Sequence, residues 1–168
     1  MTTSRVFERT VPVSRDAGAS RRRRLGVVMV VTLLAQIVLG VANELWTSLP
    51  ASGDAFAGAA PRWLLSLHVL VGTVAIVVAA VLAVSARRSD DRAWKAASIL
   101  GLAAVLGAWL SGHFFLETYG ADVLSLSMAA LGVVALGAYV AGLVRATAQA
   151  SVAADGDMGR ASHAGGVR

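Results

Sequence analysis

The stretch WLLSLHVLVGTVAIVVAAVLAVSA, residues 63–86, contains no Asp, Glu, Lys or Arg, and its one ionisable side chain is His68. An α-helix rises about 1.5 Å per residue, so about 20 residues cross a hydrocarbon core of roughly 30 Å. Residues 63–86 are therefore long enough to span a bilayer as a single helix.

Three other stretches have similar length and polarity. The chain is 57% hydrophobic with a mean hydropathy of +0.69, and the excess lies in four blocks that are apolar nearly all round. A buried helix of a soluble domain is usually shorter and carries a polar stripe. The sequence therefore predicts an all-α fold, a polytopic membrane four-helix bundle of up-down topology. The spans are expected at about residues 25–43, 63–86, 96–116 and 123–144.

The segments outside this bundle are polar. Residues 1–24 lack apolar periodicity and are expected to form a disordered basic cytoplasmic tail, followed by the bundle over residues 25–146. Residues 147–168 are expected to form a second disordered cytoplasmic tail. The run Arg21–Arg24 would lie against anionic lipid headgroups, where it either recognises lipid or only sets the orientation of the chain.

Charge distribution predicts that orientation. Of the 15 Lys and Arg residues, 14 lie before the first span, after the fourth span or in the loop at residues 87–95, and only Arg62 falls in the other two loops. By the positive-inside rule both termini are cytoplasmic. Because the basic residues flank apolar blocks, we expect contact with a lipid bilayer and not with nucleic acid. The excess of Arg over Lys suggests a bacterial source, so the expected location is the cytoplasmic (inner) membrane.

Several kinds of chemistry are excluded by missing residues. The chain has no cysteine, which excludes disulfides, cysteine-ligated iron–sulfur clusters and covalent c-type haem. It also lacks the Walker A, G-x-G-x-x-G, G-x-S-x-G and H-E-x-x-H motifs. No catalytic residue is therefore assigned, and whether the chain is an enzyme stays open.

Polar and small residues predict the inward faces of the first two spans. Gln36, Gly40 and Asn43 share one helical face, which should turn toward the bundle interior because an unsatisfied amide is costly in lipid. In the second span, small residues fall on the side of His68 and permit close helix approach. They are Gly72, Ala75, Ala79 and Ala83.

Two histidines carry the most specific functional hypothesis. His68 and His113 are expected near the outer ends of the second and third spans, at similar depth. Such a pair can ligate haem iron axially. Arg62 would pair a propionate, and Trp109 would pack against the porphyrin. This interpretation predicts a b-type haem module that passes electrons near the outer face.

The alternative gives the histidines structural roles. Each would hydrogen-bond a neighbour such as Glu117, Asp122 or Asn43, and the aromatic residues would form an interfacial belt. Neighbouring helices 8–10 Å apart would also have to splay to admit a haem. The chain would then be a non-catalytic scaffold or accessory subunit that packs against a membrane-protein partner or a second copy. Another ligand, such as a quinone, copper or protons, also remains open.

Three short motifs resemble a hairpin of the haem A synthases. They are QIVLG at residues 36–40, LP at 49–50 and LHVLVG at 67–72. In that family a helix with a Gln-x-x-Leu-Gly pattern leads into one that bears a haem-ligating or haem-facing histidine, the position that His68 matches. The family has two four-helix halves, and this chain is the size of one.

The resemblance is limited to this hairpin. Leu65 stands where an acidic residue often accompanies the family's histidine, the fourth span has no histidine, and His113 is on the third. The resemblance therefore implies haem binding at His68 and does not carry haem A synthase activity to this chain.

Overall fold

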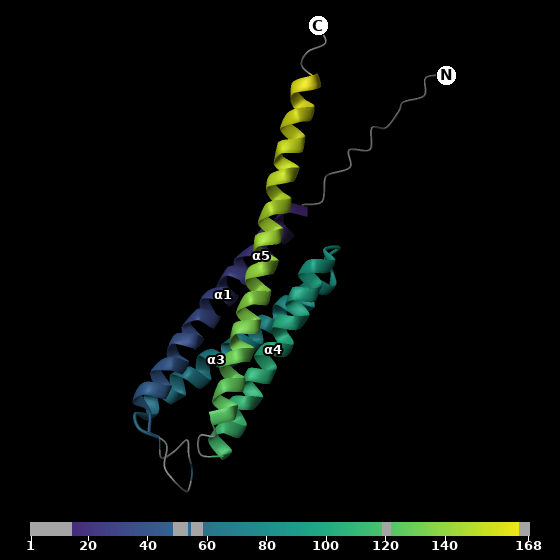
Figure 1. The fold of residues 1–168 in the computed structure, drawn as a ribbon. Coiled ribbons are helices and arrows are strands. Elements are labelled where there is room, and N and C mark those ends of the chain that lie inside the picture. The colour runs from purple at the N-terminus through teal and green to yellow at the C-terminus, as the bar shows by residue number, and fades with distance from the viewer. Residues whose placement is uncertain (1–14, 49–53, 55–58, 119–121, 165–168) are drawn as a thin grey trace, which may run out of the picture.

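The computed structural model describes residues 15–48, 54, 59–118 and 122–164. Within these ranges there are four long helices and no strand (Figure 1). The helices are α1 (Arg15–Trp46), α3 (Arg62–Arg87), α4 (Arg92–Glu117) and α5 (Asp122–Ala164). The predicted all-α four-helix bundle is confirmed.

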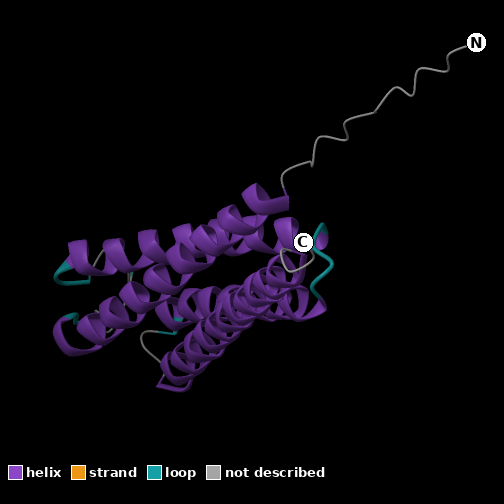
Figure 2. Cartoon of the chain, turned by 90° about the horizontal axis from the view of Figure 1, so that it is seen from above, coloured by secondary structure: helices purple, strands orange, loops and turns teal. Residues whose placement is uncertain are grey.

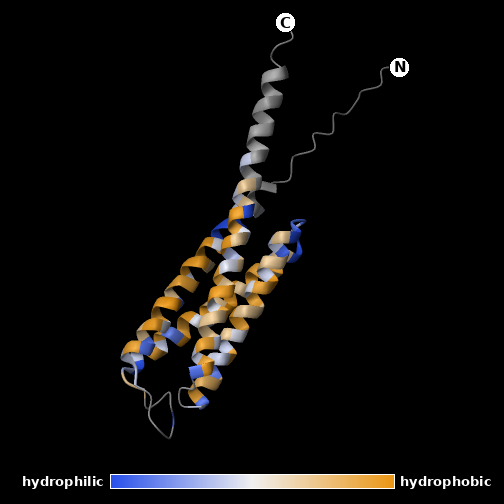
Figure 3. Ribbon diagram, viewed as in Figure 1, coloured by the Kyte–Doolittle hydropathy of each residue, from blue (hydrophilic) through white to orange (hydrophobic). Residues whose placement is uncertain are grey.

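Each helix contains a segment that is long and apolar enough to cross a membrane. The segments are Ser20–Trp46, Arg62–Arg87, Arg92–Glu117 and Asp122–Ala148. Figure 3 shows these helices as mostly hydrophobic, with hydrophilic residues concentrated near their ends. The chain is therefore a multi-pass membrane protein, as the hydropathy predicts.

Two helices continue beyond the spans expected from the sequence. α1 begins at Arg15, and α5 runs on to Ala164, so its C-terminal part projects beyond the other helices (Figure 1). Both extensions lack proline, and their many Arg and Ala residues favour helix. The helical backbone thus enters both segments that the sequence assigned to tails, whereas residues 1–14 and 165–168 lie outside the described ranges.

The four helices pack in a ring of neighbours. α1 lies against α3 and α5, and α4 lies against α3 and α5. Figure 2 shows the bundle from above. Successive helices alternate in direction, so the C-terminal end of α1 meets the N-terminal end of α3.

Hydrogen bonds are found at both ends of α3, in the described residues beside it. Ser48 and Ala60 pair as an isolated β-bridge, with N···O distances of 3.0 and 3.1 Å, which brings the end of α1 to the start of α3. At the other end, the Asp91 side chain caps α4 by accepting from the backbone N–H groups of Ala93 and Trp94. The bridge thus joins the ends of α1 and α3, and the cap stabilises the first turn of α4.

The buried core lies mainly toward the end of the bundle that holds both termini. Met29, Leu82 and Tyr139 are almost fully buried and come from three different helices. Glycines admit the large rings: a Cβ at Gly101 would lie 2.5 Å from the Tyr139 ring, and one at Gly142 would lie 2.9 Å from the Trp94 ring. In the contact between α4 and α5, each helix therefore places an aromatic ring against a glycine of the other helix.

Candidate polar site between α1 and α3

A hydrogen bond joins α1 to α3 inside the apolar part of the bundle. Gln36 Nε2 lies 3.1 Å from His68 Nε2, and both residues are partly buried. His68 is six residues from the start of α3, about 9 Å along the helix axis. The contact thus lies within the membrane-spanning segments and not in a loop.

Glycines on both helices make this contact possible. A Cβ at Gly40 of α1 would lie 3.4 Å from His68 Cε1, and a Cβ at Gly72 of α3 would lie 3.0 Å from Gln36 Nε2. Each polar side chain therefore packs over a glycine of the opposite helix. This reciprocal arrangement brings the two backbones close enough for a direct side-chain hydrogen bond.

The pair retains unused hydrogen-bonding capacity. Gln36 Oε1 and His68 Nδ1 are buried and have no partner among the described residues. If the Gln36 amide donates to His68 Nε2, the neutral ring carries its proton on Nδ1, and Oε1 remains as an acceptor. If the amide is turned over, the roles exchange. Either assignment leaves one donor and one acceptor without a partner.

A second polar layer extends the contact toward the end of α1. Asn43 Nδ2 donates to the carbonyl oxygens of Leu39, at 2.9 Å, and Leu64, at 3.4 Å. Thr47 Oγ1 donates to Asn43 Oδ1 at 2.9 Å. The Leu64 bond crosses to α3, so the predicted inward face of Gln36, Gly40 and Asn43 is confirmed.

The same end of the bundle also connects α1 to α5. Ser125 Oγ donates to Glu44 Oε2 at 3.5 Å, at an exposed position. A long, exposed hydrogen bond of this kind contributes little to stability. It nevertheless shows that the first turns of α5 lie beside the last turns of α1.

His113 has a different environment. Its side chain is 56% exposed, and its Nε2 lies 3.3 Å from Glu117 Oε1, one turn along α4. The ring stacks on Trp109, with centroids 6.0 Å apart and planes 7° from parallel. Glu117, one of the partners expected for the histidines, is thus found beside His113, whereas the partner of His68 is Gln36, which the sequence did not indicate. The side chains of Trp109, His113 and Glu117 all belong to the surface of one helix.

The four predicted haem residues lie on two helices, Arg62 and His68 on α3 and Trp109 and His113 on α4. His68 contacts α1, whereas His113 and Trp109 contact each other on the exposed face of α4. Arg62 is the first residue of α3 and is exposed. A haem ligated through Nε2 of both histidines would require the Gln36 and Glu117 contacts to break, whereas ligation through Nδ1 would leave them in place.

Asp122, another partner expected for the histidines, is the exposed first residue of α5.

The described part of the chain contains no group of three or more His, Asp or Glu side chains placed to hold a metal ion. No protein-family model, curated protein or solved structure matches the chain. The resemblance of residues 36–72 to haem A synthases therefore remains an expectation from sequence.

Proposed function

We propose that this chain is a non-catalytic membrane protein, an accessory or scaffold subunit in which His68 and His113 are structural. One observation carries the proposal: each histidine already has a side-chain partner, Gln36 for His68 and Glu117 for His113. A histidine that serves as an axial ligand needs a ring nitrogen directed at the iron. Here Nε2 of each ring, the nitrogen farther from the backbone, is directed at another side chain, so that only Nδ1 would be left for an iron.

The buried pair has the larger structural role. Interhelical hydrogen bonds in membranes contribute on average about 0.6 kcal/mol, with a maximum near 1.7 kcal/mol. Removing one partner leaves the other group buried and unsatisfied, which costs about 1–3 kcal/mol. His68 therefore helps to hold α1 on α3, whereas the exposed His113–Glu117 pair adds little.

The test is an absorption spectrum combined with thermal unfolding. Full-length protein purified in detergent from cells supplied with a haem precursor should show no Soret band. His68→Ala should lower the unfolding temperature clearly, and the matched variant His113→Ala should leave it nearly unchanged. A Soret band in the wild type that both substitutions abolish would contradict the structural role.

A second candidate is the b-type haem module that passes electrons, with His68 and His113 as ligands, Arg62 at a propionate and Trp109 against the ring. It is favoured by one observation, the buried His68 Nδ1 that has no partner among the described residues. The resemblance to haem A synthases supports the same residue. In this case Glu117→Gln should leave the low-spin spectrum unchanged, since Glu117 would not contact the iron.

We also propose that the protein lies in a bacterial cytoplasmic membrane with both termini in the cytoplasm. Arg62 is the one basic residue in the two loops that would face outward, against 14 basic residues on the other side. A reporter that is active only in the cytoplasm should work when fused after Arg145 and fail when placed at Asp54. The reverse pattern would invert the topology.

A further inference from the structure

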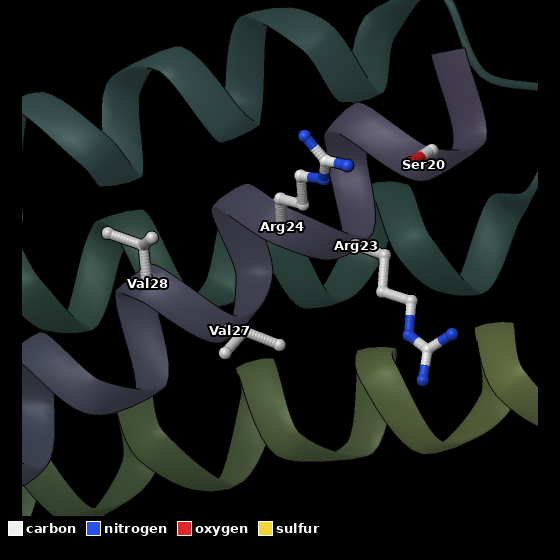
Figure 4. A pocket seen from close by; sticks show the side chains of 5 residues that line it. All are labelled: Ser20, Arg23, Arg24, Val27 and Val28. Carbon is white, nitrogen blue, oxygen red and sulfur yellow. The ribbon is translucent and has the colours of Figure 1, made fainter. Parts of the chain in front are cut away.

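We draw no further inference here: the strongest candidate, the open surface pocket on α1 that is lined by Ser20, Arg23, Arg24, Val27 and Val28, has its two guanidinium groups on opposite sides of the helix (Figure 4), so it shows no built site for a single anion and adds nothing to the contact of the arginine run with lipid headgroups that the sequence already predicts.

Discussion

The α1–α3 and α4–α5 contacts both depend on glycine, but they hold different side chains. Between α1 and α3, Gly40 and Gly72 make room for the Gln36–His68 hydrogen bond. Between α4 and α5, Gly101 makes room for the ring of Tyr139, which is 0% exposed. The first contact joins two polar groups, whereas the second places a rigid ring against backbone.

The α1–α3 contact depends on the direction of a hydrogen bond, whereas the α4–α5 contact depends only on how the side chains fit together. The Gln36–His68 pair stabilises one register of α1 on α3, because a shift along either helix breaks the hydrogen bond. The α4–α5 contact also buries two polar atoms, Trp94 Nε1 and Tyr139 Oη, neither of which has a partner among the described residues. It therefore gains its stability from packing and not from hydrogen bonds.

The largest expected effect comes from crowding the aromatic contact. Gly101→Ala places a Cβ 2.5 Å from the Tyr139 ring, so the ring or the helix must move, at a cost of about 1–3 kcal/mol. Gly132 is the matched control, since a Cβ there meets nothing within 4 Å. Thermal unfolding in detergent should show a clear loss for Gly101→Ala and little change for Gly132→Ala. Similar effects at both glycines would show that α4 and α5 do not pack in this way.

A smaller but still distinct effect is expected at the polar contact. Gly72→Leu forces a side chain toward Gln36 Nε2, which lies 3.0 Å from the Cβ position, and should lower both yield and unfolding temperature. The amide is the flexible end of a side chain and can yield in part, so the loss should be less than for a leucine at Gly101. Val77→Leu, at a 58% exposed position of the same helix, should change little. Equal losses at Gly72 and Val77 would mean that the inward face of α3 is misassigned.

The smallest effect is expected at the exposed histidine. His113→Ala removes an i, i+4 contact with Glu117 and one ring of a stacked pair, but the His113 and Glu117 side chains are 56% and 57% exposed. Exposed pairs of this kind contribute about 0.3–0.5 kcal/mol. The unfolding temperature should therefore fall by no more than a degree or two. A loss as large as that of His68→Ala would show that His113 has a buried partner.

The sequence predicts the architecture because membrane spans have a strong and redundant signal. Length and apolar composition alone identify all four helices, and the spacing of Gln36, Gly40 and Asn43 identifies the face of α1 that contacts α3. The ends of α1 and α5 are harder to predict. Polar residues such as Arg21–Arg24 are compatible with both a helix and a flexible tail, and no proline decides between them.

The sequence does not predict which residues pair across helices. Gln36 and His68 are each identifiable as inward-facing, but their direct contact depends on the relative register of α1 and α3. The reciprocal placement of Gly40 and Gly72, each four residues from the polar side chain of its own helix, is the signal that could have revealed the pair. His113 is near an interfacial end of its span by sequence, yet its rotation about α4 is set by packing with α5 and leaves it exposed.

The central claim is that Gln36 and His68 are direct partners that hold α1 on α3, and a double-mutant cycle tests it. Unfolding free energies of Gln36→Ala, His68→Ala and the double variant, measured in detergent, should give a coupling of about 0.5–2 kcal/mol. The control cycle of Gln36→Ala with His113→Ala should be additive. A Gln36–His68 cycle that is also additive, to within about 0.3 kcal/mol, would contradict the account.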